Sequence, residues 1–379
     1  MPNSKLYPSV LWLLSAKQPG LSCAKGRLRQ KEQVMACYSP AHVSRWVKAG
    51  FAAVLLCGGF ALPYAARADE ITGAGSSFAA PLYQAWSAAA PSGVDVRVNY
   101  QTIGSGAGQN QILAGTVDFG ASDAPMGHAR LVAGGLVQVP TAIGGVVVTA
   151  NVPGVADGAL RLSGPVLAAI YAGTITQWND ARIAALNPGV KLPDQVIAPL
   201  HRADGSGTTY VFTDYLAHVS PEWKIGVGKG TSVAWPVGAG ARGNDGIAAY
   251  VQNTAGSIGY LEYAYAARNH LALVQMQNHD GFFVSPSATS FAQAAQSAQW
   301  DEADLTAALS DVEGAQSWPI ITTTYVLFPV TATADNQGQA VRRFFRWGLV
   351  GGEAVTGQLD YVPLPEQIRA RVLRRLGGE

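Results

Sequence analysis

The sequence predicts an α/β protein with largely parallel sheets. Short apolar runs typical of buried strands alternate with longer runs whose apolar residues recur at helical spacing. Such alternation is typical of sheets whose strands are connected by helices. Of the 379 residues, 48% are hydrophobic and only 13% are charged, while 43 glycines and 21 prolines favour tight loops. This length and composition suit one large or two medium globular domains with substantial cores.

Strands are expected where β-rich apolar runs end at glycine, proline or polar turns. The stretch VDVRVNYQTIG alternates between apolar and polar residues, whereas VQVPTAIGGVVVTANVPG is the nearly continuous run of a buried strand. In chain order, the expected strand regions are 71–75, 94–104, 116–125 (a strand and its turn), 137–154, 195–202 and 318–330.

Helices are expected between these strands. In FAAPLYQAWSAAA, Phe78, Leu82 and Trp86 fall at helical spacing, and the two short helices of 163–173 and 179–189 each close on glycine. In chain order, the expected helical regions are 78–90, 105–116, 163–173, 179–189, the stretch after Thr208, 339–358 and 366–379. The last is basic and amphipathic, which indicates a packed helix with a solvated charged face rather than a membrane or nucleic-acid contact.

The N-terminal part of the chain has the features of a secretory signal. Arg45 and Lys48 precede an uncharged apolar run over 49–66, and the run ends in Ala-Arg-Ala before Asp69. We expect cleavage after Ala68 and export to the periplasm. A transmembrane anchor is the alternative, although the run is near the lower length limit for spanning a bilayer.

The segment in front of the signal is unusual. Residues 1–34 are basic, which is best explained by translation that begins at Met35, with a functional basic arm as the alternative. Cys57 raises the question of lipid modification, but lipid-modified cysteines normally follow a small residue, and Leu56 precedes this one. Cleavage before Asp69 would remove all three cysteines, so the mature protein would have no disulfide and no thiol chemistry.

The charge of the expected mature protein argues against nucleic-acid binding. From Asp69 onward there are 17 Lys and Arg against 24 Asp and Glu, a formal net charge of −7. Nucleic-acid binding relies on a basic surface. Any anion that this protein binds must therefore be captured by local geometry.

Three glycine-rich turns each lead from an expected strand into an expected helix. They are GAGSSF, IGSGAG and ADGSGTT, and the third follows Arg202. A helix N-terminus presents free N–H groups and partial positive charge, and small residues allow an anion to approach the backbone. A single turn of this kind is usually an ordinary helix cap, but three in one chain predict an anion site.

Other chemistries lack the residues they need. IGSGAG does not meet the dinucleotide-binding G-x-G-x-x-G spacing, no G-x-x-x-x-G-K-[ST] phosphate loop occurs, and the scattered histidines indicate no metal or cofactor. Ser206 lies in G-S-G rather than in the G-x-S-x-G turn of hydrolases, and no base is identified for it. We therefore expect no enzyme, with a phosphatase that uses Ser206 as nucleophile as the alternative.

Asp123, in DFGASDAP, has two interpretations. It is either a cap for the turn that follows it or a hydrogen-bond acceptor for a protonated oxyanion. In the second case the site would reject an anion that has no proton to give. Asp204 is placed to orient Arg202 or to cap the next helix.

Several motifs together resemble the periplasmic phosphate-binding proteins of high-affinity phosphate-specific ABC importers. The resemblance covers essentially all of 69–379 in order, through TGAGSSFAAPLYQAW, NYQTIGSGAG, TVDFGASDAP, IGGVVVTANVPG, HRADGSGTTYVFTDYLA, WPVGAGARGNDGIAAYV and IGYLEYAYA. It implies a type II periplasmic binding protein with two lobes, a hinge, and a ligand cleft between the lobes. The lobes would be 69–145 with 325–379, and 146–324, after a removed segment 1–68.

The resemblance also implies the ligand set and the partners. Inorganic phosphate would be bound by a monomer and delivered to the permease subunits of the importer. Asp123 would accept a phosphate proton and exclude sulfate, with Asp204 in support. The donors would be the side chains of Ser77, Ser105, Arg202, Ser206 and Thr208 and the backbone N–H groups of Phe78 and Gly207.

Two positions depart from the family pattern. Threonine is common where Ser77 stands, and the hydroxyl is retained. The second turn commonly reads IGSSGG, so Gly106 replaces a serine and puts any second hydroxyl contact there in doubt. A receptor for another tetrahedral oxyanion, such as sulfate, is the alternative within binding proteins.

Overall fold

The computed structural model describes residues 68–301, 303–331 and 336–377. These residues belong to one compact unit. The apolar run 49–66, the basic extension and the three cysteines lie outside them. In the described ranges, no helix is both long and apolar enough to cross a membrane.

One eight-stranded sheet contains two parallel groups of strands. The order across it is β2-β1-β3-β13-β4-β8-β6-β7. We call the parallel strands β2, β1 and β3 the first group, and the parallel strands β8, β6 and β7 the second group. The bounds are β1 (Asp69–Gly75), β2 (Val96–Thr102), β3 (Phe119–Ser122), β4 (Leu136–Ala150), β6 (Ala198–Arg202), β7 (Ala239–Ala241), β8 (Ser257–Glu262) and β13 (Ile321–Pro329).

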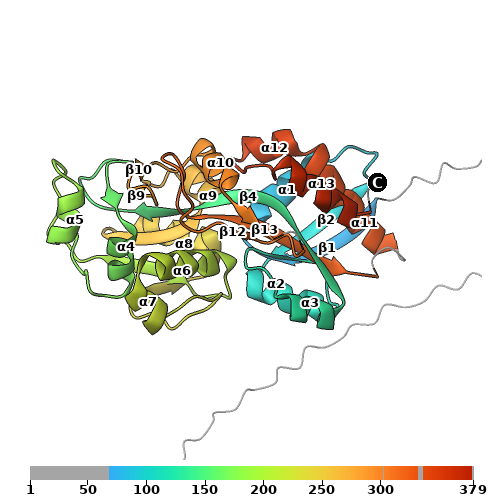
Figure 1. Cartoon of the computed structure of the whole chain (residues 1–379), viewed down its shortest axis with the longest axis horizontal. Helices are drawn as coiled ribbons and strands as arrows, with labels where there is room; N and C mark the ends of the chain where they lie inside the picture. The colour runs from blue at the N-terminus through green and yellow to red at the C-terminus, as the bar shows by residue number, and fades with distance from the viewer. Residues whose placement is uncertain (1–67, 302, 332–335, 378–379) are drawn as a thin grey trace, which may run out of the picture. The chain divides into compact units, whose positions relative to one another are not determined.

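Strands β4 and β13 join the two groups, and they correct the expectation of a largely parallel sheet. β13 runs antiparallel to both β3 and β4, and β4 runs antiparallel to β8. The long β4 pairs with β13 over its first ten residues and with β8 from Val146 to Ala150, so it extends across both groups (Figure 1). The reason is the path of the chain. It leaves the first group through β4 and returns to it through β13, so these two neighbouring strands run in opposite directions.

Two small sheets complete the strands. β5 (Arg161–Leu162), β9 (Gln275–Gln277) and β10 (Phe283–Val284) form a three-stranded sheet, and β11 (Gln299–Trp300) pairs with β12 (Ala307–Ala308).

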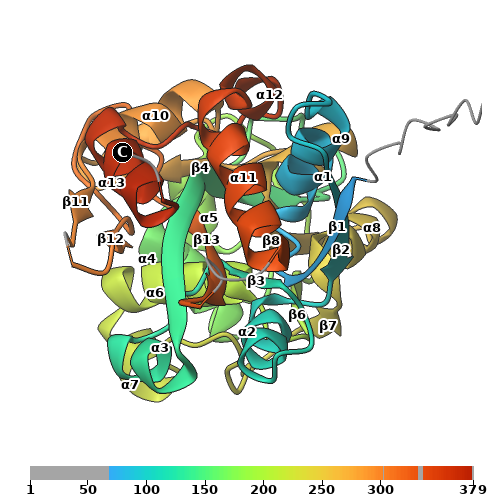
Figure 2. The same cartoon turned by 90° about the vertical axis from the view of Figure 1, so that its right-hand side faces the viewer.

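The helices lie against the sheet and against one another. α2 packs on β1 and β3, α8 packs on β6 and β8, and α9 and α10 pack on β4. Figure 2 shows α1 and α11 near β1, where Tyr83 of α1 stacks edge-on against Phe345 of α11. The bounds are α1 (Ala80–Ala89), α2 (Ser105–Leu113), α3 (His128–Gly134), α4 (Gly164–Tyr171), α5 (Ala181–Leu186), α6 (Gly207–Val219), α7 (Pro221–Gly226), α8 (Gly243–Asn253), α9 (Tyr263–Arg268), α10 (Ala288–Gln296), α11 (Asn336–Val350), α12 (Glu353–Gln358) and α13 (Glu366–Arg375).

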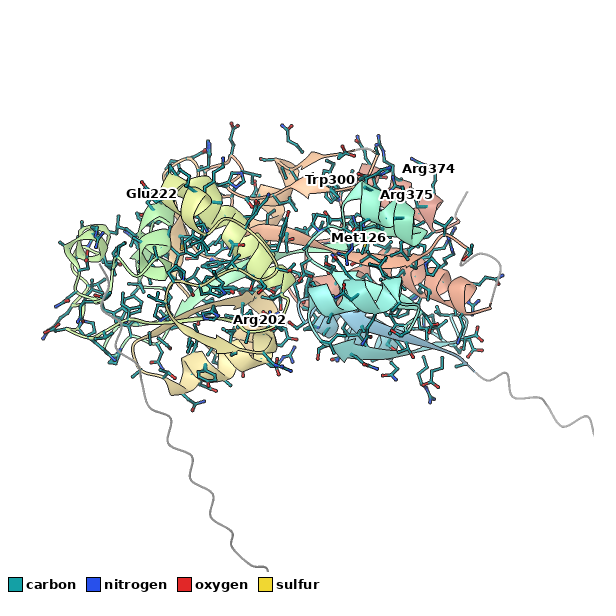
Figure 3. All side chains as sticks on the ribbon, turned by 90° about the horizontal axis from the view of Figure 1, so that it is seen from below. Met126, Arg202, Glu222, Trp300, Arg374 and Arg375 are labelled. Atoms are coloured by element: carbon teal, nitrogen blue, oxygen red, sulfur yellow. The ribbon has the colours of Figure 1, made fainter. Side chains whose placement is uncertain are left out.

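The expected strands and helices are all present, with two differences of detail. The helical region 339–358 is broken into α11 and α12 at Gly351 and Gly352. Ser105 is the first residue of α2 rather than its cap, which is Gly104 with φ 90°. The basic helix α13 buries Ile368 and Val372, as expected for a packed amphipathic helix; Figure 3 labels two of its arginines, Arg374 and Arg375.

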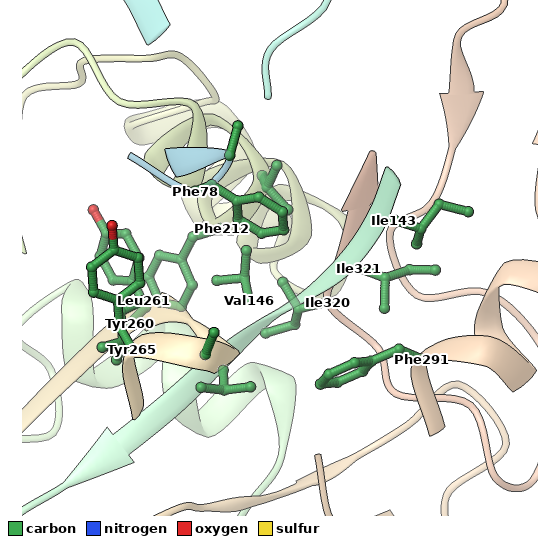
Figure 4. Packing of buried hydrophobic residues seen from close by; sticks show 14 of the residues in the cluster. Phe78, Ile143, Val146, Phe212, Tyr260, Leu261, Tyr265, Phe291, Ile320 and Ile321 are labelled. Carbon is green, nitrogen blue, oxygen red and sulfur yellow. The ribbon is translucent and has the colours of Figure 1, made fainter. Parts of the chain in front are cut away.

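The core runs under both groups of strands. Side chains from the first turn, β4, α6, β8 and the residue before β13 pack in one cluster, among them Phe78, Val146, Phe212, Tyr260 and Ile320 (Figure 4). All five are 0% exposed. Such close packing fixes the strand ends that carry the glycine-rich turns.

Candidate anion-binding site

The three glycine-rich turns come from two different groups of strands. The first two follow β1 and β2 of the first group, and the third follows β6 of the second group. The Gly106 N–H donates to the Gly205 carbonyl at 2.8 Å, which joins the second turn to the third. The second and third turns therefore lie side by side, although about 100 residues separate them along the chain.

Glycine lets α2 approach the first group closely. A Cβ at Gly108 would lie 2.5 Å from the Cα of Gly75 and 2.6 Å from the carbonyl oxygen of Ala74. No side chain fits there without moving backbone. This contact places Ser105, at the start of α2, beside the end of β3.

Asp123 lies directly after β3 and is 2% exposed. Its carboxylate accepts from the Ser76 hydroxyl at 2.6 Å and from the Ser105 hydroxyl at 3.3 Å. The following turn is instead capped by Ser122, whose hydroxyl accepts from the Ala124 N–H at 3.2 Å. The hydrogen bonds thus account for the turn without Asp123.

The pKa of Asp123 is set by opposing effects of burial and of nearby donors. Burial raises its pKa to about 6, against the lowering effects of hydroxyl donors such as Ser76 and of the positive charge of Arg202. The group is therefore mostly ionised at pH 7. A Cβ at Gly207 would lie 2.5 Å from Asp123 Oδ2, so the carboxylate faces the first residue of α6.

Arg202 ends β6 and is 4% exposed; Figure 3 labels it in the middle of the described body. Its Nε donates to Asp204 Oδ1 at 2.8 Å, and a second nitrogen donates to Asp204 Oδ2. Burial alone would raise the pKa of Asp204, but hydrogen bonding and charge attraction from Arg202 outweigh it and hold the pKa below its usual value. Asp204 therefore orients the guanidinium, which is one of the two roles that its spacing allowed. The remaining amine donates to Thr208 and to Asn244, both at 3.3 Å.

The third turn places the N-terminus of α6 beside Arg202. Ser206 is the cap, and its hydroxyl oxygen accepts from the Thr209 N–H at 3.0 Å. Ser206, Gly207 and Thr208 are all buried. His201 stacks on Trp235 with ring centroids 4.9 Å apart, so the one histidine adjacent to this turn in sequence is engaged elsewhere.

The first turn presents Ser77 and Phe78. The Ser77 hydroxyl oxygen accepts from the side-chain amide of Asn244 at 3.1 Å, and the Ser77 carbonyl accepts from the Tyr265 hydroxyl at 2.8 Å. The Phe78 ring is buried in the core, and its carbonyl accepts from the Tyr361 hydroxyl at 2.6 Å. Only the backbone of Phe78 is thus available to an anion.

These features converge on one buried arrangement of hydroxyls, backbone N–H groups, one guanidinium and one carboxylate. Comparison with known proteins identifies the family. A family model described as "PBP superfamily domain" matches residues 63–348. The phosphate-binding protein PstS of Pasteurella multocida is 48% identical over 307 residues, which cover 81% of this chain and 89% of that protein.

The chain belongs to the PstS family. The relative from Haemophilus influenzae, also named phosphate-binding protein PstS, is 46% identical over 81% of this chain and 92% of its own length. Among solved structures, the periplasmic phosphate-binding protein PfluDING bound with phosphate has a TM-score of 0.64 at 22% identity, covering 80% of this chain and 92% of its own. A phosphate-bound substrate-binding protein from Clostridium perfringens has a TM-score of 0.58 at 17% identity, covering 78% of this chain and 100% of its own. These structures show that the fold is that of type II periplasmic binding proteins.

Relative to this PstS-like arrangement, sequence reasoning missed three residues. Ser76 donates to Asp123, Asn244 contacts both Ser77 and Arg202, and Tyr265 holds the Ser77 carbonyl. The adjacent serines of GAGSSF offered a signal for Ser76, since either hydroxyl could have been chosen. The neutral Asn244 and Tyr265 lie in the family motifs WPVGAGARGNDGIAAYV and IGYLEYAYA, but neither was assigned to the site, because both lie far from the turns along the chain.

Proposed function

We propose that this member of the PstS family is a high-affinity receptor for inorganic phosphate that delivers it to an ABC importer. The observation that carries the proposal is the pairing of a buried, ionised Asp123 with a buried Arg202 at the N-terminus of α6. A site for a fully ionised anion gains nothing from a carboxylate, whereas a site for a protonated anion needs an acceptor.

Phosphate would be held by donors from both groups of strands. The Arg202 guanidinium, already fixed by Asp204, would supply positive charge. The partial positive charge at the starts of three helices would add to it. The proposed donors are the hydroxyls of Ser77, Ser105, Ser206 and Thr208, the guanidinium of Arg202, and the N–H groups of Phe78 and Gly207.

Asp123 would give the site its preference for phosphate over sulfate. Near neutral pH phosphate carries one or two protons, so a phosphate O–H can donate a hydrogen bond to an ionised carboxylate. Sulfate has no proton at this pH, so its oxygen would face the carboxylate across a buried space with no hydrogen bond between them. The repulsion of two unpaired negative groups would exclude it.

The strand crossings support a division into two lobes. We propose that 69–145 with 325–379 form one lobe and that 146–324 form the other, with β4 and β13 as the hinge. Supporting this, β4 changes its partner from β13 to β8 at residue 146. Phosphate would contact both lobes only when they are closed and would thereby shift the population toward the closed state.

The remaining parts of the proposal concern place and partners. The protein would be exported to the periplasm after cleavage behind Ala68 and would act there as a monomer. It would pass phosphate to the permease subunits without chemical change. The cap hydrogen bond of Ser206 supports a binding role for this serine rather than a nucleophilic one.

Calorimetric titration of the wild type with phosphate and with sulfate at pH 8 tests the function. We expect tight phosphate binding and no measurable sulfate binding, and tighter sulfate binding would overturn the proposal. Asp123→Asn should retain phosphate binding but admit sulfate. Continued exclusion of sulfate by this variant would show that Asp123 has another role.

A second assay addresses the phosphatase alternative. Wild type and Ser206→Ala are incubated with a chromogenic phosphate monoester, and phosphate affinity is measured in parallel. We expect no turnover by either protein and weaker phosphate binding by the variant. Turnover that disappears in Ser206→Ala while phosphate affinity is unchanged would favour the enzyme.

A further inference from the structure

Asn244 connects the two sides of the site, although it lies in none of the glycine-rich turns. It is in the first turn of α8, which follows β7 of the second group, and it is 0% exposed. Its Nδ2 and its backbone N–H donate to the Ser77 hydroxyl oxygen at 3.1 and 3.3 Å. Its Oδ1 accepts from the Arg202 guanidinium at 3.3 Å.

We propose that Asn244 is a positioning residue for phosphate, one that aims a donor from each side of the site; this inference rests on the proposed function. Two N–H groups occupy the acceptor capacity of the Ser77 oxygen, so the Ser77 hydrogen is left to donate elsewhere. The same amide holds one amine of Arg202 on the side opposite Asp204. One neutral side chain thereby sets the direction of both donors.

The contacts of Asn244 also link the first group of strands to the second. Ser77 follows β1 of the first group, whereas Asn244 and Tyr265 follow β7 and β8 of the second. Tyr265 donates to the Ser77 carbonyl at 2.8 Å, and this carbonyl belongs to the same peptide group as the Phe78 N–H. A hydrogen bond to the carbonyl polarises the peptide and strengthens its N–H as a donor. The contacts between the two groups thus orient the Ser77 hydroxyl and strengthen the Phe78 N–H, the two donors of the first turn.

The chemistry of the position requires an amide. Asn244 donates to Ser77 and accepts from Arg202 at once, and it does so without charge. An aspartate would keep the contact with Arg202 but would lose the side-chain donor to Ser77. It would also add a negative charge to the site, which would repel an incoming anion.

Phosphate dissociation rates measured by stopped flow test the proposal. The variants are Asn244→Ala, Asn244→Asp and Tyr265→Phe, each checked by circular dichroism. Asn187→Ala is the matched control, because Asn187 is a buried asparagine whose side chain hydrogen-bonds to the backbone of Arg161 and Ile183. We expect dissociation to accelerate about tenfold or more in Asn244→Ala, further in Asn244→Asp, and several-fold in Tyr265→Phe. The control should lower the melting temperature and leave the dissociation rate unchanged.

A double-mutant cycle separates positioning from general support of the fold. If Asn244 acts through Ser77, part of the effect of Asn244→Ala on affinity disappears in a Ser77→Ala background. Full additivity, or an unchanged dissociation rate in both Asn244→Ala and Tyr265→Phe, would overturn the inference while leaving the proposed function intact. Failure of the wild type to bind phosphate would overturn both.

Discussion

The buried carboxylate of Asp123 should destabilise the phosphate-free protein at neutral pH. Its pKa is about 6 in the folded state, raised by burial, against 3.8 for an exposed aspartate. Between these two values the folded state holds a proton that the unfolded chain has released. Stability therefore falls as pH rises from about 4 to about 6, and it stays lower above that range.

The size of the effect follows from the two pKa values. Each pKa unit corresponds to about 1.4 kcal/mol, so ionisation of Asp123 lowers the free energy of unfolding by about 3 kcal/mol. Asp123→Asn removes this ionisation. The variant should be more stable relative to the wild type at pH 8 than at pH 4, by most of that 3 kcal/mol. The hydrogen bonds that Ser76 and Ser105 donate to the charged carboxylate need no separate correction, because they are among the causes that set this pKa.

Urea unfolding in phosphate-free buffer at pH 4 and pH 8 measures the difference. Asp194→Asn, at an exposed position, controls for the change in net charge. A stability difference between Asp123→Asn and wild type that is the same at both pH values would refute the reasoning. So would a variant that becomes relatively less stable at pH 8.

Three further predictions concern neighbouring parts of the structure. Burial raises the pKa of Glu262 to about 8, so wild-type stability should fall between about pH 4.5 and pH 8; urea unfolding should show that Glu262→Gln weakens this dependence. Gly108→Ala forces α2 away from the sheet, so it should lower the free energy of unfolding by about 1–3 kcal/mol and the melting temperature by several degrees. Gly226→Ala places its Cβ in open space and should leave the melting temperature unchanged. Arg202→Lys loses the paired hydrogen bonds to Asp204 and should weaken phosphate binding at least about tenfold by calorimetry, and equal affinity would contradict this.

Local sequence patterns predicted the elements of the fold better than their arrangement. Apolar periodicity and glycine positions located β4, α1 and α6 because these signals depend on residues a few positions apart. The antiparallel β4 and β13 were not foreseen, since their pairing joins segments about 180 residues apart. A buried strand has the same apolar composition whether its neighbour runs parallel or antiparallel.

The same limit applies to the site. The sequence singled out Arg202, Asp123 and the glycine-rich turns because charge and backbone freedom are unusual at those spacings. It left two roles open for Asp204, of which the hydrogen bond from Arg202 fits the first. Asn244 and Tyr265 carry no such mark, because an asparagine near a helix start and a tyrosine in an apolar run have many ordinary uses.

The charges of the site and of the whole chain are consistent with reversible capture. The expected mature chain carries a formal net charge of −7, so long-range attraction does not draw an anion in. Within the proposed phosphate site, the Arg202 guanidinium is already paired with Asp204, and Asp123 adds a further negative charge. Attraction must therefore come mainly from neutral donors, which act only at hydrogen-bond distance and only when both groups of strands supply them. On the proposed lobe division, separating the groups would remove about half of these donors at once, and an opening at β4 and β13 would release the anion without a competing ligand.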